Sequence, residues 1–286
     1  MPVRARIDLP YFDQLLARLK RRDPEFTEAF GRHVHWGYWS RPSRADGTAA
    51  DFARAAERLC RRICDAAKPK PGMDVLDVGC GFGGTIASLD ERIHPLRLTG
   101  LNIAKRQLVR ARRLVVPHEG NQIAFVEGDA CKLPFRASSF DVVLAVECVF
   151  HFSSRAAFLR QAARVLRPGG RLVLSDFVAT GKAVEGPIPA DLVERVVRFY
   201  GSGSVVTLAD YRALAREVGL EMGVVDDVTR GMLPTWPFAK KLLGRISSDA
   251  RFATEWVEKE AREGISRYVI LTFRRPVRRA KKARAS

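Results

Sequence analysis

Two side chains close to the ends of predicted strands have the types that proton transfer requires. His151 follows a buried apolar run at 140–146, and Asp176 lies in a second run at 171–177. A carboxylate beside an imidazole orients the ring and stabilises its charged form, which suits a general base acting on a hydroxyl group. Glu147, just past the first run, is a rival base. The alternative is that His151 packs against the phenylalanines beside it and that Asp176 only caps the next segment.

A glycine-rich turn follows another apolar run earlier in the chain. Gly79, Gly81 and Gly84 have the spacing of a dinucleotide-binding turn, whereas Gly79, Gly81 and Gly83 form a second pattern with Asp77 before them. Glycine lets the backbone turn sharply and approach a ligand closely. A helix that starts behind the turn presents N–H groups to an anionic ligand group. The glycines alone do not choose between the two patterns.

Strand-like and helix-like patterns alternate through most of the chain, which predicts a doubly wound, mostly parallel α/β sheet. We expect seven strands, at 74–78, 96–102, 123–127, 140–146, 171–177, 221–228 and 266–273. Helices precede the sheet, and the region from about 178 to 206 interrupts the alternation as an inserted helical lid. The two closing strands are expected to form an antiparallel pair. Ligands of such sheets bind outside the carboxyl ends of the strands, where the predicted polar residues gather.

Four segments in chain order resemble the motifs of the class I S-adenosylmethionine-dependent methyltransferases. They are the turn at 77–83, the Gly-Asp-Ala at 128–130, the segment at 133–143 and the segment at 164–174. The resemblance covers residues 73 to 176 and implies a Rossmann-like fold with S-adenosylmethionine as cofactor. It also implies that Asp129 accepts a hydrogen bond from the adenine amino group. Asn102 stands where the family usually has an acid on the ribose.

An aromatic cluster at 33–39 resembles the N-terminal segment of small-molecule methyltransferases that act on natural-product sugars, isoprenoids and quinones. An aromatic ring there can lie against a sulfonium, and the Tyr38 hydroxyl can bind the methionine carboxylate. The alternative is that the cluster packs the N-terminal helices onto the sheet. The predicted cofactor-binding residues are Tyr38, Asp77, Gly79, Gly81, Gly83, Asn102, Gln107, Asp129, Ala130 and Glu147. Glu147 is the candidate partner of the methionine amine, and no metal site is predicted.

The resemblance favours O-methylation of a small secondary metabolite, because histidine after the fourth strand serves as base in similar enzymes. Methylation of an isoprenoid or aromatic carbon is the alternative, with Glu147 stabilising a cationic substrate. Two other classes are an NAD(P)-dependent oxidoreductase and a non-enzymatic S-adenosylmethionine-binding module. No Tyr-x-x-x-Lys or comparable hydride-transfer set supports the oxidoreductase.

Composition bounds the domain organisation. The 286 residues are 47% hydrophobic, which is ample for a core. We divide them into an N-terminal helical segment with the aromatic lid (1–70), a methyltransferase domain (71–275) and a basic disordered tail (276–286). The net charge is +17, and seven of the basic residues lie at 274–286. The other arginines are spread along predicted helices, which indicates a solvated surface rather than a nucleic-acid-binding face.

Cysteine usage and hydropathy indicate the compartment. The five cysteines are an odd, scattered set, typical of reduced thiols rather than a disulfide framework or a zinc site. No apolar run has membrane-spanning length, and no signal peptide is recognisable. A cytoplasmic enzyme with a small-molecule acceptor is the expectation, and a homodimer is compatible with the sequence.

Overall fold

The computed structural model describes residues 10–182, 186, 191–192, 194–195 and 205–277. One seven-stranded sheet organises them in the order β3-β2-β1-β4-β5-β7-β6. Its strands are β1 (Asp74–Val78), β2 (Arg97–Asn102), β3 (Gln122–Glu127), β4 (Phe140–Ala145), β5 (Leu166–Ala179), β6 (Glu221–Asp227) and β7 (Ser266–Arg274). The first five strands pair in parallel, and β7 is antiparallel to both β5 and β6. The predicted fold class and the closing antiparallel pair are confirmed.

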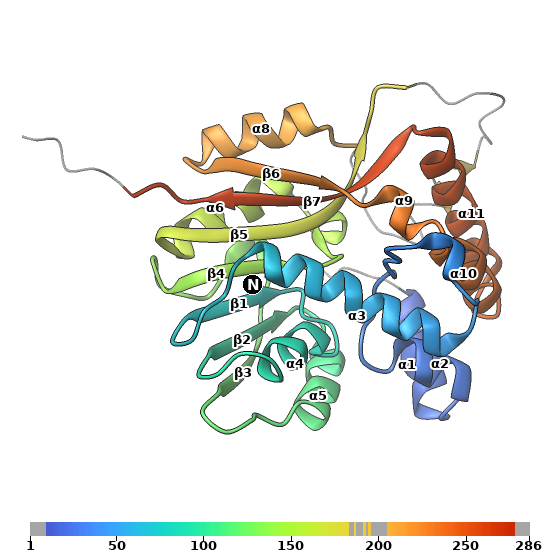
Figure 1. The fold of residues 1–286 in the computed structure, drawn as a ribbon, viewed down its shortest axis with the longest axis horizontal. Helices are drawn as coiled ribbons and strands as arrows, with labels where there is room; N and C mark the ends of the chain where they lie inside the picture. The colour runs from blue at the N-terminus through green and yellow to red at the C-terminus, as the bar shows by residue number, and fades with distance from the viewer. Residues whose placement is uncertain (1–9, 183–185, 187–190, 193, 196–204, 278–286) are drawn as a thin grey trace, which may run out of the picture.

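Helices precede, connect and follow the strands (Figure 1). They are α1 (Pro10–Lys20), α2 (Pro24–Phe30), α3 (Ala49–Ala66), α4 (Gly84–Asp90), α5 (Lys105–Leu114), α6 (Arg155–Val165), α8 (Leu208–Glu217), α9 (Thr229–Met232), α10 (Thr235–Leu243) and α11 (Ser248–Glu263). Short 3-10 turns lie at η1 (Pro42–Arg44), η2 (Ala130–Lys132) and η3 (Val149–His151). Side-chain caps fix the starts of α3 and α8. The Thr48 hydroxyl accepts the Asp51 N–H, and Thr207 forms a capping box with Asp210.

The two faces of the sheet have separate cores, because successive side chains of a strand point to opposite faces. Val75 of β1 belongs to the core that contains α3, where Phe52 and Leu59 are fully buried. Leu76 belongs to the other core, which contains α6 and α8. Both faces are therefore covered, and this explains why the central strands are continuous apolar runs.

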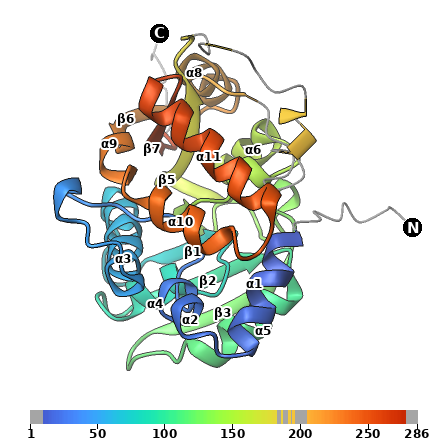
Figure 2. The same cartoon turned by 90° about the vertical axis from the view of Figure 1, so that its right-hand side faces the viewer.

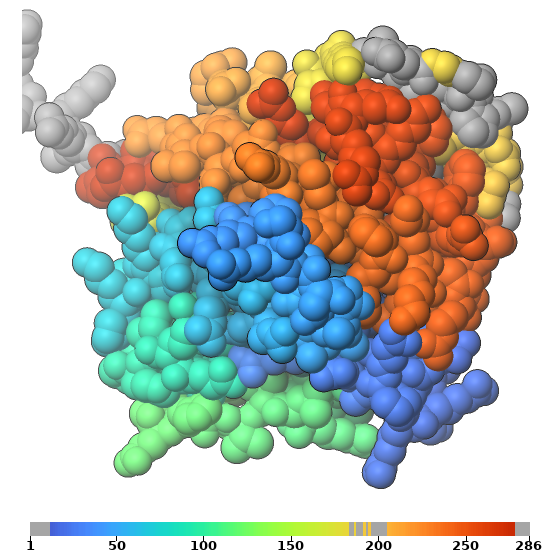
Figure 3. All heavy atoms as spheres, turned by 45° about the vertical axis from the view of Figure 1, so that its right-hand side comes forward, coloured from blue at the N-terminus to red at the C-terminus, as the bar shows by residue number. Residues whose placement is uncertain are grey.

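A helical layer lies at the carboxyl ends of the parallel strands and joins distant parts of the chain. Figure 2 shows α1 and α2 beside α10 and α11 at this end of the sheet. Phe52 of α3 stacks on Phe238 of α10 with ring centroids 4.6 Å apart. The Trp39 amide donates to the Gly231 carbonyl at 2.8 Å. In Figure 3 the N-terminal residues, in blue, accordingly lie against the C-terminal helices, in orange.

The largest difference between predicted and observed strand bounds concerns β5, since the bounds of the other strands differ by no more than one residue. The Arg-Pro-Gly-Gly sequence at 167–170 predicts a turn, but β5 already starts at Leu166, which pairs with Phe140 of β4. A register shift between Phe140 and Val142 accommodates Gly169, whose φ is +86°. Most of the expected lid at 178–206, and the part of the expected tail beyond residue 277, lie outside the described residues.

Candidate active site

The glycine-rich turn leaves the end of β1 and places backbone against a cavity. Gly79 has φ +75°, and a Cβ built there would lie 2.7 Å from the Cβ of Cys148. Gly83 has φ +82°, and a Cβ built there would lie 2.9 Å from Cγ2 of Val115. A side chain at either position would therefore fill the turn or displace a neighbouring element. This confirms why the turn needs glycine.

A cavity at the carboxyl ends of β1, β2, β3 and β4 brings together most of the predicted residues. Those that line it are Gly79, Gly81, Asn102, Gln107, Asp129, Ala130, Glu147 and His151. Gly83, Asp77, Tyr38 and Asp176 are not among its lining residues. Asp77, Tyr38 and Asp176 contact other parts of the fold instead.

Asn102, Gln107 and Asp129 form the polar side of the cavity. The Asn102 side-chain amide donates to Gln107 Oε1 at 2.8 Å, and its oxygen accepts the Ala104 N–H at 3.0 Å. Gln107 is buried, and its hydrogen bond with Asn102 fixes the orientation of the Asn102 amide. Asp129 Oδ1 accepts the Cys131 N–H at 2.8 Å, as the cap of η2. Asp129 therefore caps η2 and lines the cavity at the same time.

Asp77 lies beneath the turn rather than in the cavity. It is 1% exposed, and its Oδ2 has no hydrogen-bond partner among the described residues. Burial raises the pKa of this carboxyl well above its ordinary value. Its position, one residue before the end of β1, makes it a support of the turn.

Glu147 is the most strained polar residue at the cavity. It has φ +53°, in the region that non-glycine residues rarely adopt, and its N–H donates to Ser175 Oγ at 2.9 Å. Its Oε1 is buried without a partner among the described residues. Burial raises the pKa of Glu147 to about 8. A buried carboxyl held in this way is typical of a functional position.

His151 ends the 3-10 turn that follows β4. Its ring lies 4.3 Å from that of Phe150 and 6.3 Å from that of Phe12 of α1, centroid to centroid. It lines the cavity described above and also an adjoining apolar cavity whose other lining residues include Leu15, Phe30 and Leu243. His151 therefore lies between a polar and an apolar compartment.

The expected contact between His151 and Asp176 is corrected by the structure. Asp176 is fully buried, and its carboxylate accepts Arg155 Nε at 2.7 Å, Arg155 Nη2 at 3.2 Å and the Tyr211 hydroxyl at 2.5 Å. Burial raises the pKa of Tyr211, so its hydroxyl stays a donor. Asp176 thus joins β5 to α6 and α8 and does not orient the imidazole.

The role expected for Tyr38 is also corrected. Its ring lies under the Arg62 guanidinium, 4.8 Å from the centroid, and leaves no room for a side chain at Gly231. Trp39 is buried and donates from Nε1 to Asp51 at 2.6 Å. These two members of the aromatic cluster pack α3 against the C-terminal helices, which is the packing alternative.

Four residues just before Tyr38 line the cavity instead, and the sequence analysis did not select them. They are Arg32, His33, Val34 and His35. In an extended segment, alternate residues point to the same side, so the pair of histidines two residues apart was the available signal. Because the segment was interpreted as an aromatic cluster, the two histidines were not predicted to line the cavity.

Sheet order, glycine turn and strand-end cavity together define a class I methyltransferase. The protein-family model described as "Methyltransferase domain" matches residues 76–174. The chain is 34% identical over 264 residues to 27-O-demethylrifamycin SV methyltransferase from Amycolatopsis mediterranei, covering 87% of this chain and 92% of that protein. It is 32% identical to O-methyltransferase cnsE from Penicillium expansum, covering 73% and 72%. The chain therefore belongs to the class I S-adenosylmethionine-dependent methyltransferases.

Solved structures show the same fold at lower identity. Geranyl diphosphate C-methyltransferase from Streptomyces coelicolor A3(2), in complex with S-adenosyl-L-homocysteine, superposes with a TM-score of 0.68 at 17% identity and covers 87% of this chain and 90% of that one. The cavity residues fit S-adenosylmethionine, because the unpartnered Glu147 oxygen suits a cationic ligand and the Gly79 turn leaves space for its approach. None of the described helices combines the length and apolarity that a membrane crossing requires.

The first prediction concerns the adenine contact. We expect Asp129→Ala to weaken S-adenosylhomocysteine binding by about 1–3 kcal/mol, the range for losing a buried hydrogen-bond partner. Asp129→Asn keeps an oxygen for the Cys131 N–H but offers an amide donor to the adenine, so we expect a loss of similar size. Isothermal titration calorimetry measures both, with Asp65→Ala as the control in an ion pair outside the cavity. Unchanged affinity in both Asp129 variants would place the adenine elsewhere.

The second prediction concerns the pH dependence of stability at Glu147. The folded pKa of about 8 exceeds the ordinary value of 4.5. The unfolded chain therefore loses this proton first as pH rises, and the wild type loses stability between these two values. We expect Glu147→Gln to raise the melting temperature at pH 8 and to change it little at pH 5, with a gain on the order of 2 kcal/mol. Scanning fluorimetry from pH 5 to 9 measures it, and a difference that is constant with pH would contradict it.

Proposed function

We propose that this enzyme methylates a hydroxyl group of an apolar small molecule. The observation that carries the proposal is the position of His151 between the cofactor cavity and the adjoining apolar cavity. The apolar cavity suits a largely hydrophobic acceptor, since it is lined by side chains such as Leu15, Phe30 and Leu243. The 34% identical relative is named 27-O-demethylrifamycin SV methyltransferase, and this name supports a small-molecule acceptor that is methylated on oxygen.

In this proposal the chain's own groups position the acceptor and move one proton. The bound cofactor supplies an electrophilic methyl group on a sulfonium. The acceptor oxygen forms the bond to the methyl carbon, and the electron pair of the broken carbon–sulfur bond stays on sulfur. His151 takes the hydroxyl proton and later releases it to solvent. Much of the rate comes from alignment, because displacement needs near-collinear partners.

Glu147 supports a second candidate function, methylation of carbon. It also lines both cavities, and one oxygen of its buried carboxyl has no hydrogen-bond partner within the described part of the chain. An ionised carboxylate there would stabilise a cationic carbon formed by methyl addition. With a pKa of about 8, however, Glu147 is mostly protonated at pH 7 before ligands bind. This favours the oxygen acceptor.

The test is an assay with isotopically labelled S-adenosylmethionine and a panel of apolar alcohols, phenols and their deoxy analogues. The expected product carries the label in a methoxy group and is absent with the deoxy analogues. Mass spectrometry with NMR distinguishes methoxy from C-methyl products. Label attached to carbon, at a rate unaffected by loss of the hydroxyl, would replace the proposal with its alternative.

A further inference from the structure

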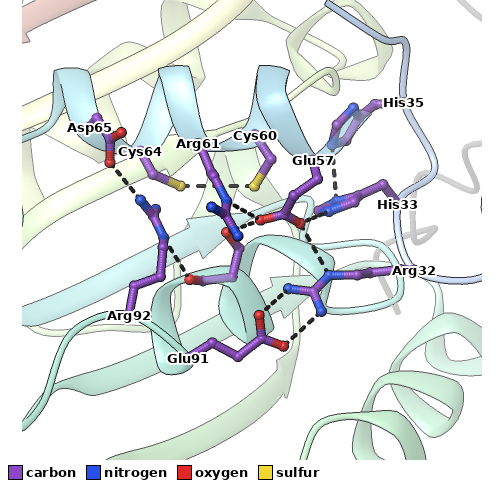
Figure 4. A network of polar contacts seen from close by, with 11 residues as sticks. Arg32, His33, His35, Glu57, Cys60, Arg61, Cys64, Asp65, Glu91 and Arg92 are labelled. Atoms are coloured by element: carbon purple, nitrogen blue, oxygen red, sulfur yellow. Dashed lines mark hydrogen bonds and ion pairs between the residues drawn. The ribbon is translucent and has the colours of Figure 1, made fainter. Parts of the chain in front are cut away.

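Three buried side chains with metal-ligating atoms meet between the N-terminal segment and α3. They are His33, His35 and Cys60, whose Nδ1, Nε2 and Sγ atoms lie within 4.8 Å of one another. All three residues are buried among the described residues, and Cys60 is fully so. Figure 4 shows His33 and His35 on the extended segment beside α3, which carries Glu57 and Cys60.

The hydrogen bonds of the two rings decide where their protons are. His33 Nε2 lies 2.7 Å from a carboxylate oxygen of Glu57, so this nitrogen carries a proton and donates. His35 Nδ1 lies 2.9 Å from the Trp36 carbonyl, so it donates as well. The remaining nitrogens, His33 Nδ1 and His35 Nε2, therefore face each other at 3.1 Å with lone pairs.

Two opposed lone pairs beside a thiol form a site for a cation. We propose that His33, His35 and Cys60 bind a zinc(II) ion that fastens the N-terminal segment to α3. Zinc–nitrogen bonds of about 2.0–2.1 Å in tetrahedral geometry place two nitrogens about 3.3 Å apart, close to the 3.1 Å that the structure shows. The thiol needs to approach by on the order of 1 Å to complete the geometry.

The surroundings of the three atoms are those of metal sites. A histidine that binds a metal usually donates its other N–H to a carboxylate or a backbone carbonyl, and both kinds are present here. Glu57 is itself held in place by the side chains of Arg61 and Ser88. The outer carboxylate is thus held in a fixed position.

The ligand types select the class of ion. Two imidazoles and a thiolate suit zinc, cobalt or copper, whereas magnesium and calcium prefer oxygen ligands. Without an ion, the Cys60 thiol lies at hydrogen-bond distance from the Cys64 thiol, with the two sulfur atoms 4.0 Å apart. Ion binding forms a sulfur–metal bond and releases the Cys60 thiol proton to solvent. Water would supply the fourth ligand, as is usual where a protein gives zinc three ligands.

The site has a consequence for the fold. The segment that carries His33 and His35 forms one wall of the cofactor cavity. It also packs closely against the start of α4, because a Cβ at Gly84 would collide with the His33 ring. An ion that binds only the folded chain stabilises it by mass action. Bound zinc is therefore expected to raise the melting temperature.

The experiment titrates cobalt(II), a spectroscopic substitute for zinc, into the full chain that has been stripped by chelation and kept reduced. A cobalt–thiolate bond gives a charge-transfer band in the near ultraviolet. We expect one equivalent of cobalt to saturate this band in the wild type, zinc to displace it, and magnesium to leave it unchanged. Zinc should also raise the melting temperature of the stripped protein.

Variants identify the ligands. Cys60→Ala should abolish the band and the zinc-dependent rise in melting temperature, while Cys131→Ala, which removes a more exposed thiol outside the cluster, should retain both. Circular dichroism confirms that each variant is folded. Absence of a saturable band in the wild type overturns the proposal whatever the variants do. A band that persists in Cys60→Ala and is lost in Cys131→Ala also overturns it.

Discussion

Replacing His151 by alanine is expected to lower turnover about 10²–10⁴-fold, the usual contribution of a positioned base. The ring lies between the two cavities, so its loss removes the acceptor for the hydroxyl proton. The affinity for S-adenosylhomocysteine should change much less, because that ligand has no reacting methyl group. Steady-state kinetics with one accepted substrate, together with calorimetric binding, measure the two effects separately. His118→Ala is the control, since His118 is a half-exposed histidine bonded to Asp90, and its loss should leave turnover near wild type.

The pH profile distinguishes the two candidate bases. A base that must lose its proton before it acts gives a rising limb in the pH profile of turnover. A Glu147 base gives a limb near its pKa of about 8. We expect the limb of the wild type to persist in Glu147→Gln and to disappear in His151→Ala. If His151→Ala keeps most of its activity and Glu147→Gln loses it, carbon methylation becomes the better explanation.

The sheet and the cofactor cavity could be predicted because they depend on local patterns. Continuous apolar runs specify buried parallel strands, and polar residues such as Asp129 come directly after such runs. Since the carboxyl ends of parallel strands share one edge of the sheet, residues far apart in sequence converge there without further information. Asn102 and Asp129 were predicted in this way.

The contacts between side chains of different elements could not be predicted in the same way. Asp176 is in β5 next to the strand that precedes His151, and adjacency alone suggested a pair. What decides its partner is the register of α6 and α8 over the sheet, which presents Arg155 and Tyr211 to it. No sequence pattern predicts that an arginine in the first turn of a helix, such as Arg155, forms a buried ion pair.

In the N-terminal segment, too, the sequence did not predict which side chains face the cavity. Tyr38 and Trp39 have the chemistry to contact a sulfonium, but the extended backbone turns them towards α3 and the C-terminal helices. His33 and His35 thereby face the cavity and Cys60. The three ligating atoms come from segments 25 residues apart, and no spacing rule for zinc sites covers that arrangement.

The largest expected effect on stability follows from the pair of Arg155 and Asp176. Both side chains are almost completely buried, at 8% and 0% exposure. Arg155→Ala leaves the Asp176 carboxylate with the Tyr211 hydroxyl but without its cation. Loss of one partner of a buried ion pair costs about 3–5 kcal/mol, because the remaining charge stays desolvated. Urea denaturation at pH 7, with the free energy of unfolding extrapolated to water, measures this loss.

Two further variants show whether the cost comes from an isolated buried charge. Arg160→Ala, on the same helix, breaks an exposed ion pair with Glu217 and should cost no more than about 1 kcal/mol. Replacing both partners, as Arg155→Met with Asp176→Leu, should recover much of the stability lost in Arg155→Ala, because no unpaired charge remains. If the double variant is as unstable as the sum of its single variants, packing rather than charge explains the effect. If Asp176 positioned His151 after all, Asp176→Asn would shift the rising limb of the pH profile; we expect that variant to lower stability and leave the limb in place.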